Sequence, residues 1–448
     1  MNVGFISLGC SKNLVDTEMM VGLFKREKFN IVNDPAEADI IVVNTCGFIE
    51  PAKEEAINTL LEMAEYKKKK CKFLVATGCL VERYKDELKK SLPEVDLFIK
   101  FSEYSTFWEQ IVESMKSKLK EKKEYDSLNE QLEYEDRVLT TGNNYAYLRI
   151  ADGCDNFCTF CAIPYIRGRF KSRTEEDILS EAKKLVSQGI REFIVIAQDT
   201  TKYGVDIYNK PMLADLLHKL SEIEGVEWIR FLYSYPETIT EDLIEEVKNN
   251  NKICKYFDIP MQHISNKVLK KMNRKSTKES TMKLLEKLRK EIPDVIIRST
   301  LMVGFPNEDE NDFNELYDFV KWAKFDKLGC FKYSKEDGTG AATMDNQVHP
   351  MTKNSRYNKI MKLQQEISKK NLERFINKEF KVLVEDAYVN DEGDLYFVGR
   401  TYMDVPEIDG YVYIKATKEE AEKIELNTFN ICKIKDIKEY DLIGEFVK

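Results

Sequence analysis

The sequence predicts an α/β protein built from an N-terminal doubly wound parallel sheet, a partial barrel of six strand–helix units and a small C-terminal β-barrel. Three observations support this fold class. Apolar strands alternate with helical segments in two regions, a charged stretch separates those regions, and short strands with a polar turn follow them. The boundaries expected from these patterns are 1–116, a charged linker over 117–136, then 137–370 and 371–441.

The first domain is predicted from three apolar strands, at residues 3–8, 40–45 and 73–77, with helical sequence between them. Such alternation produces parallel strands, because each helix returns the chain to the same end of the sheet. The stretch that follows is rich in charge and poor in apolar residues, which is typical of a linker.

The central domain contains six further predicted strands, at residues 147–151, 192–197, 227–233, 256–260, 295–303 and 328–333. Six units are fewer than the eight of a closed barrel, so we expect a partial (β/α)6 barrel. One helix between them has clear ends, since Thr174 and Asp177 offer an N-terminal capping box and Gly189 stops it. A polar helix near 352–376 precedes the short strands and the polar turn at 391–394, which indicate a small β-barrel.

Composition limits the class of protein. The chain has 448 residues, is 43% hydrophobic and carries a net charge of −9, which argues against a broad nucleic-acid surface. Ten cysteines without the spacing of a small disulfide-rich domain indicate thiols and metal in a reducing compartment. The chain begins with a strand and has no long apolar stretch, so we expect a cytoplasmic protein with no membrane segment.

The most informative motif is C-x3-C-x2-C, formed by Cys154, Cys158 and Cys161. This spacing supplies three thiolates to one iron–sulfur cube and leaves one iron open to chelate a small molecule, as in the reductive cleavage of S-adenosylmethionine (SAM). The alternative is a zinc site, but zinc pairs are usually C-x2-C or C-x4-C with a second pair nearby, and no second pair follows.

A second set of cysteines, Cys10, Cys46 and Cys79, is spread along the first domain. Each follows a predicted parallel strand by one or two residues, and such strand ends share one edge of a sheet, where ligands bind. Adjacent glycines allow close approach of the backbone. We therefore predict a second three-cysteine cluster, although buried cysteine can also serve as a small apolar residue. The latter is expected for Cys71, Cys254, Cys330 and Cys432.

Four segments connect the chain to a known family: SLGCSKNLVD at 7–16, NTCGFI at 44–49, QDTTKYG at 198–204 and DIPMQHIS at 258–265. Because of these segments and the two cysteine sets, the chain resembles the radical SAM methylthiotransferases over essentially its whole length. Within that family the chain is most similar to the branch that modifies an aspartate of small-subunit ribosomal protein twelve. The tRNA-modifying branch typically has Asn in place of Asp199 and a Ser-Gly pair near His263.

The resemblance implies a radical SAM core, a C-terminal TRAM barrel, two [4Fe-4S] clusters and two molecules of SAM. The cluster on Cys154, Cys158 and Cys161 would cleave SAM to a radical. The cluster on Cys10 and its two partners would carry the sulfur that is methylated and delivered to the β-carbon of the aspartate. Implied partners are the ribosomal protein and an electron donor of the flavodoxin or ferredoxin type, and the sulfur donor is not identified. No catalytic residue beyond the cluster ligands is expected.

Three side chains are candidates for contact with SAM. Phe160, between the cysteines of the triplet, could stack near adenine, although ordinary aromatic packing is an equal alternative. Arg298, on the fifth strand of the central domain, could contact the carboxylate or ribose of SAM, with a salt bridge as its alternative. Gln198 is the third candidate. His263 stands at a strand end, where it can equally be structural.

The C-terminal region is acidic, with 11 Lys and Arg against 18 Asp and Glu in residues 371–448. An RNA-binding module should be basic, so no RNA-specific binding is expected there. We interpret Asp404, Glu407 and Asp409 as a candidate docking face for a basic ribosomal protein, against the alternative that they only increase solubility. The preferred function is thus aspartate methylthiotransfer to a ribosomal protein. The alternatives are methylthiotransfer to a tRNA adenosine and non-catalytic electron transfer.

Overall fold

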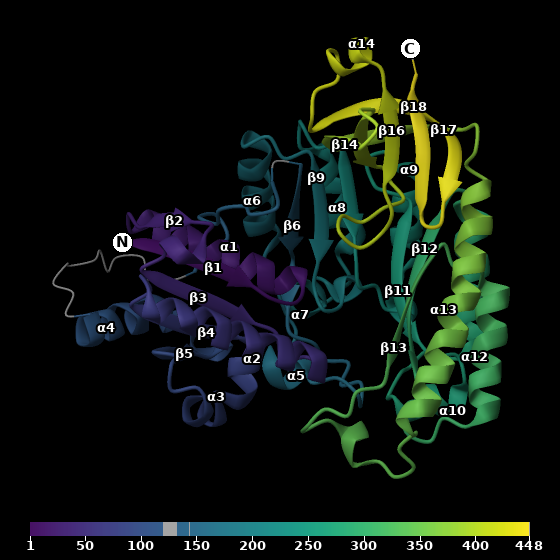
Figure 1. Cartoon of the computed structure of the whole chain (residues 1–448). Coiled ribbons are helices and arrows are strands. Elements are labelled where there is room, and N and C mark those ends of the chain that lie inside the picture. Colours follow the sequence, from purple (N-terminus) through teal and green to yellow (C-terminus); the bar gives the residue numbers. More distant parts are fainter. Residues whose placement is uncertain (120–131, 143, 448) are drawn as a thin grey trace.

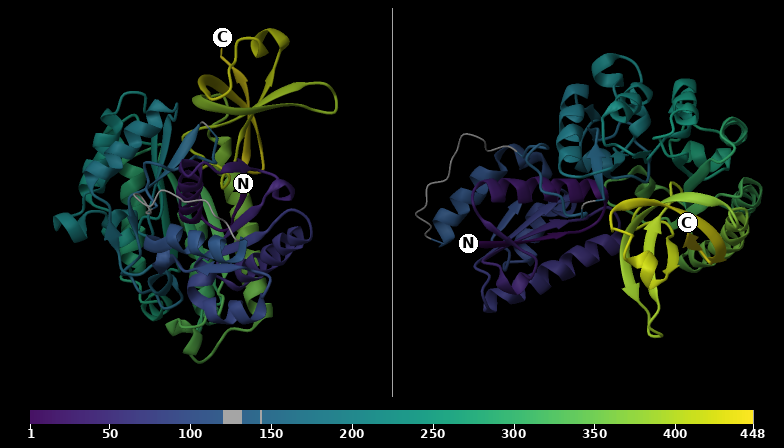
Figure 2. Two further views of the ribbon diagram at one scale, coloured as in Figure 1. Left: turned by 90° about the vertical axis from the view of Figure 1, so that its left-hand side faces the viewer. Right: turned by 90° about the horizontal axis from the view of Figure 1, so that it is seen from above.

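The computed structural model describes residues 1–119, 132–142 and 144–447. It contains an N-terminal sheet, a central parallel barrel and a closed C-terminal β-barrel, which confirms the predicted fold class (Figure 1). The N-terminal domain lies beside the central barrel, and the C-terminal barrel lies over one end of it (Figure 2). In the described part of the chain, no helix is long and apolar enough to cross a membrane.

The N-terminal sheet has five parallel strands in the order β2-β1-β3-β4-β5. These are β1 (Asn2–Ser7), β2 (Asn30–Val32), β3 (Ile40–Thr45), β4 (Phe73–Gly78) and β5 (Leu97–Ile99). The three central strands were predicted, whereas the two edge strands have only three residues each and show no periodicity. The helices are α1 (Ser11–Arg26), α2 (Glu50–Glu65), α3 (Cys79–Ser91) and α4 (Phe107–Leu119). Separate apolar clusters on the two faces of the sheet make it doubly wound.

The predicted linker falls largely outside the described residues. Helix α4 includes its first residues, 117–119, and residues 120–131 are not described. Its last residues contact both neighbouring domains: Asp136 pairs with Arg26 at 2.6 Å, and the Tyr134 ring lies 3.4 Å from the Arg173 guanidinium.

The central domain contains the six predicted strands, all parallel: β6 (Tyr145–Arg149), β9 (Glu192–Ile196), β10 (Trp228–Phe231), β11 (Tyr256–Gln262), β12 (Ile296–Val303) and β13 (Lys327–Lys332). They form two three-stranded sheets, β10-β9-β6 and β11-β12-β13. A single parallel bridge, Ile229 to Ile253, links the two sheets. The barrel is therefore partial and has a free edge at β13.

Helices cover the outside of this barrel: α6 (Glu175–Ser187), α8 (Leu213–Glu222), α9 (Glu241–Asn249), α11 (Lys278–Glu291) and α12 (Glu310–Ala323). Thr174 caps α6 as predicted, because its side chain accepts from the Asp177 amide at 3.3 Å. The long helix α13 (Pro350–Glu373) matches the predicted polar helix and packs against β13.

The C-terminal barrel has the order β14-β15-β16-β18-β17 and is closed. Its strands are β14 (Glu379–Val389), β15 (Leu395–Arg400), β16 (Val412–Ala416), β17 (Thr428–Lys438) and β18 (Asp441–Phe446). The last strand extends beyond residue 441, where the sequence pattern placed the end of the domain.

One apolar cluster joins all three domains inside the partial barrel. It contains Val15 and Met19 of α1, inward-facing side chains of the barrel strands such as Ile194, and Met403 and Val405 from the loop between β15 and β16. Because this loop inserts into the barrel, the C-terminal domain closes one end of it.

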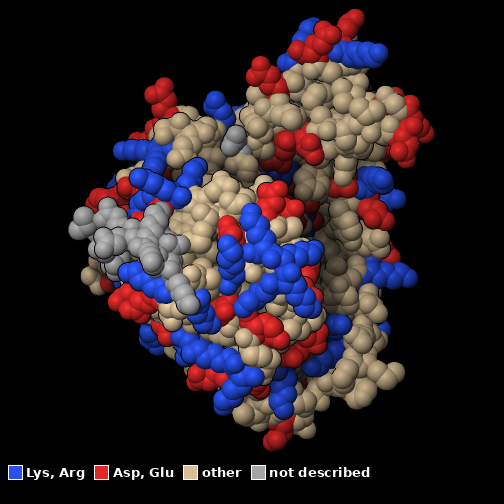
Figure 3. All heavy atoms as spheres, turned by 60° about the vertical axis from the view of Figure 1, so that its left-hand side comes forward, with Lys and Arg blue, Asp and Glu red and all other residues tan. Residues whose placement is uncertain are grey.

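The predicted acidic docking face is wrong for two of its three residues. Asp404 is only 4% exposed and pairs with Lys327 at 2.8 Å. Asp409 accepts from the Tyr256 hydroxyl at 2.7 Å. The apolar insertion carries both carboxylates inside, and only Glu407 stays exposed. On the face of the molecule shown in Figure 3, acidic and basic side chains are interspersed.

Candidate functional site

The loops that carry Cys10, Cys46 and Cys79 meet at the carboxyl edge of β1, β3 and β4. A Cβ atom on Gly9 would lie 2.7 Å from the Cβ of Cys46, and one on Gly47 would lie 3.1 Å from the carbonyl carbon of Cys79. A Cβ atom cannot lie this close to its neighbours, so the loops can approach in this way only because Gly9 and Gly47 have no side chain. The three loops therefore lie against one another at this edge of the sheet, and a shared cluster on their cysteines stays a prediction. Cys10 is exposed, whereas Cys46 and Cys79 are buried.

The fully buried side chain of Asn13 connects these three loops. Its Nδ2 donates to the carbonyl oxygens of Leu8 at 2.9 Å and Thr45 at 3.1 Å, and its Oδ1 lies 3.5 Å from the sulfur of Cys79. The same Oδ1 accepts from Arg167 at 2.7 Å. The sequence analysis did not identify Asn13, and its only signal was its place three residues after Cys10.

The cysteine triplet lies in the loop between β7 (Ala151–Asp152) and α5 (Ile163–Ile166). The sulfur of Cys158 is 3.7 Å from the hydroxyl of Tyr235 and 3.9 Å from Nη1 of Arg274, whose guanidinium covers the Tyr235 ring at 4.2 Å. Burial raises the pKa of Cys154 to about 11 and raises that of Cys161 as well. Both shifts favour the protonated thiol, so metal binding at Cys154 and Cys161 would release protons.

The loop of the triplet is held by the segment after β9. Asn156, between Cys154 and Cys158, donates to Asp199 at 2.8 Å and accepts from Lys202 at 2.8 Å. Two residues of the 198–204 motif thus position the loop through one amide.

The two cysteine sets share one interface between the N-terminal domain and the barrel. Cys79 packs in a buried cluster with Ala162 and Ile166, directly after Cys161. Burial raises the pKa of the Cys79 thiol to about 12, and Arg167 opposes this shift. No local pattern predicted this contact, because it joins segments more than 80 positions apart.

Ion pairs hold that interface on two sides. On one side, Asp16 of α1 accepts from Arg149 at 2.5 Å and from Arg167 at 2.7 Å. On the other side, buried Glu336 pairs with Arg83 at 3.1 Å. Arg83 also donates to the carbonyl of Gly47 at 2.7 Å, next to Cys46. The cysteine loops are therefore tied directly to the barrel.

The donor type of both sets fits an iron–sulfur cluster. Among the described residues, no three His, Cys, Asp or Glu side chains surround one ion position. A cube places each thiolate on a different iron, so its ligands do not converge on a single point. Each set consists of cysteines alone, as such clusters prefer.

The three candidate SAM contacts have different surroundings. Arg298 forms a salt bridge with Asp258 at 2.9 Å, the alternative considered for it. Gln198 donates to Asp152 at 2.9 Å, and its buried Oε1 has no partner in the described structure. Phe160 is partly buried against an apolar cluster beside the barrel. Contact of any of them with SAM stays a prediction.

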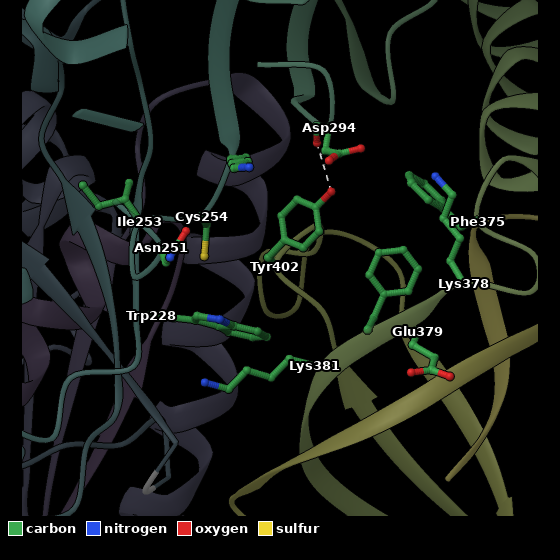
Figure 4. A pocket seen from close by; sticks show the side chains of 12 residues that line it. Trp228, Asn251, Ile253, Cys254, Asp294, Phe375, Lys378, Glu379, Lys381 and Tyr402 are labelled. Atoms are coloured by element: carbon green, nitrogen blue, oxygen red, sulfur yellow. Dashed lines mark hydrogen bonds between the residues drawn. The ribbon is translucent and has the colours of Figure 1, made fainter. Parts of the chain in front are cut away.

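The pocket in Figure 4 lies away from these residues. It is bounded by residues at the amino ends of β10 and β11, including Trp228 and Cys254, and by Phe375 and Lys381 near the start of the C-terminal barrel. Tyr402 donates to the carbonyl of Asp294 at 2.9 Å across its wall. None of the predicted site residues lines it.

Three family models match successive parts of the chain. The Radical SAM superfamily matches residues 148–320, the Uncharacterized protein family UPF0004 matches residues 2–100, and the TRAM domain matches residues 376–447. These matches follow the three units of the structure.

Solved structures support the fold. The radical SAM methyltransferase TsrM from Kitasatospora setae, with cobalamin and a [4Fe-4S] cluster, matches with a TM-score of 0.56 and 13% identity over 76% of each chain. The cobalamin-dependent radical SAM enzyme OxsB matches with a TM-score of 0.51 and 14% identity over 82% of this chain and 56% of its own.

Curated relatives are much more similar. The protein named ribosomal protein uS12 methylthiotransferase RimO from Alkaliphilus oremlandii is 59% identical over 446 residues, or 99% of each chain. The RimO protein of Acetivibrio thermocellus is 49% identical over 452 residues, covering 99% of this chain and 98% of its own. Because this identity spans all three domains, the chain belongs to the RimO family of radical SAM methylthiotransferases.

Proposed function

We propose that this enzyme transfers a methylthio group to the β-carbon of an aspartate in small-subunit ribosomal protein uS12, using two [4Fe-4S] clusters and two molecules of SAM. The observation that carries the proposal is the packing of Cys79 against Ala162, the residue after Cys161, at the interface where Arg167 also bonds Asn13. The match to this chain covers 97% to 99% of the length of these relatives, and their names support uS12 as the substrate.

Cys154, Cys158 and Cys161 would hold the cluster that cleaves SAM, and Cys10, Cys46 and Cys79 the cluster that supplies sulfur. Electrons would come from a flavodoxin- or ferredoxin-type donor. The exposure of Cys10 suits the second role, because sulfur from outside must reach that side. The burial of Cys154 and Cys158 suits the first role, because water and free thiols would quench a carbon radical.

Several side chains would support these clusters. The cation of Arg274, 3.9 Å from the sulfur of Cys158, offsets negative charge on a buried thiolate ligand. Asn13 holds the loops of the other set in register through its two backbone contacts and its bond to Arg167. Their task is positioning, since the chemistry belongs to the cofactors.

The test uses anaerobically reconstituted enzyme, SAM, a strong reductant and purified uS12. Peptide mass spectrometry should find one methylthio group in place of one hydrogen on an aspartate, and Cys158→Ala should abolish the product. A parallel reaction with tRNA examines the alternative substrate. A methylthio group on tRNA adenosine, with uS12 unchanged, would contradict the proposal.

A further inference from the structure

The inner face of the last two barrel strands is open. Along β12 the buried and half-exposed residues alternate, and the register pairs each half-exposed residue with one on β13. We call these six residues the inner strip: Arg298, Thr300 and Met302 on β12, and Lys327, Gly329 and Phe331 on β13. Phe331 is 53% exposed. The opposite face is buried in the main core through side chains such as Leu301 and Cys330.

One end of the inner strip reaches the cysteine triplet. Met302 packs with Phe160 against the buried rings of Phe305 and Tyr333. Phe160 immediately precedes Cys161. A chain lying along the strip would therefore approach the region where the proposed chemistry takes place.

The other end opens into a pocket of about 540 Å³ between the barrel, α13 and the C-terminal domain. Its lining includes Arg298, Lys327, Gly329, Gln364, Asp409, Tyr411, Tyr413, Tyr440 and Asp441. Gln364 is only 1% exposed, and its Oε1 has no hydrogen-bond partner in the described structure. The pocket thus combines carboxylates and tyrosines beside a buried glutamine.

The charge balance of this pocket favours a cation. Arg298 is already paired with Asp258 at 2.9 Å and Lys327 with Asp404 at 2.8 Å. Asp441 is half-exposed and accepts a hydrogen bond from the Tyr411 amide at 2.9 Å. Asp409 also faces Arg298 at 3.8 Å, and its side chain is only 4% exposed. Asp441 is therefore the lining carboxylate left for a further cation, and neighbouring tyrosine rings attract cations as well.

Gly329 provides an independent indication of a ligand. A glycine inside a strand weakens the strand and often marks close approach of another backbone. A Cβ atom on Gly329 would meet nothing nearer than 3.9 Å, and its backbone is ordinary strand. The protein itself therefore does not require glycine at this position.

We propose that the inner strip and its pocket bind an extended basic segment of the protein substrate. A Lys or Arg side chain of the substrate occupies the pocket beside Asp441 and the neighbouring tyrosines, and the substrate backbone passes over Gly329 towards Phe160. This inference rests on the proposed function and adds where and how the substrate docks. It also gives the acidic C-terminal domain a role inside the cleft in place of the predicted outer face.

The test measures direct binding of purified uS12 to the reconstituted enzyme and the KM of uS12. Gly329→Leu adds a bulky side chain to the strip, where a Cβ atom meets nothing nearer than 3.9 Å, and should weaken binding at least about tenfold, the scale of a lost interface contact. Gly329→Ala should have a much smaller effect. Asp441→Asn keeps the acceptor for the Tyr411 amide, removes the charge, and should weaken binding and its salt dependence.

The matched control is Asp318→Asn, which removes an exposed carboxylate on the outer helix α12 and should bind like the unchanged enzyme. Iron content and the unfolding midpoint of each variant show whether the fold is intact. If Gly329→Leu and Asp441→Asn bind uS12 normally, the docking proposal is overturned while the proposed function stands. If the unchanged enzyme neither binds nor modifies uS12, the proposed function fails and the docking proposal falls with it.

Discussion

Removal of the Asp16 carboxylate should weaken the docking of the N-terminal domain onto the barrel. Asp16 is 2% exposed and forms ion pairs with Arg149 and Arg167 at 2.5 and 2.7 Å, and both guanidinium groups are buried. In Asp16→Ala the two cations keep Asp152 as a carboxylate partner, at 3.4 and 3.0 Å, together with neutral partners such as Asn13. Because loss of one partner leaves buried charge uncompensated, the free energy of unfolding should fall by about 3–5 kcal/mol.

The chain provides a reporter for this measurement. It has three tryptophans, and Trp108 is buried in the N-terminal domain. In a background with Trp228→Phe and Trp322→Phe, urea unfolding followed by fluorescence reports on that domain alone. The matched control is Glu65→Gln, which removes a carboxylate of the same domain from an exposed pair with Lys68 and should change little.

A double-mutant cycle with Arg167→Ala would assign the loss to the interdomain pair. If Asp16→Ala costs less than about 1 kcal/mol, as expected for an exposed pair, or shows no coupling to Arg167, then the ion pairs do not hold the interface. The reasoning from burial would then be refuted.

Three further outcomes are expected. The reconstituted enzyme should hold about eight irons, and Cys154→Ala or Cys10→Ala should each leave about four, as counted by iron and sulfide analysis. A count of about four in the unchanged enzyme would show that it has no second cluster. Cys46→Ala should still form 5'-deoxyadenosine without methylthio transfer, whereas Cys158→Ala should lose both, and equal loss would contradict the two roles. Burial lowers the pKa of His263 to about 3, so the unfolded chain binds the extra proton first on acidification. Between pH 6.5 and about 3, His263 should therefore lower the free energy of unfolding by about 1.4 kcal/mol for each pH unit, and His263→Gln should remove this contribution from the measured pH dependence.

The sequence alone determined the class of fold and predicted the two cysteine sets. Both rest on short-range patterns: the alternation of apolar strands with helices, and the spacing of Cys154, Cys158 and Cys161 within eight residues. The meeting of Cys10, Cys46 and Cys79 was also predictable, because parallel strands in one sheet must end at the same edge. The membership of the family followed from motifs that lie at these same places.

The tertiary structure alone decided how the domains meet. Asn13 and Arg167 are 154 positions apart, and Arg83 and Glu336 are 253 apart, so no local pattern relates them. The acidic loop was misread for the same reason. Its charges predicted a solvated face, but burial of Met403 inside the barrel outweighs that preference and takes Asp404 to Lys327. Charge is read residue by residue along a sequence, whereas burial depends on which distant surfaces become neighbours.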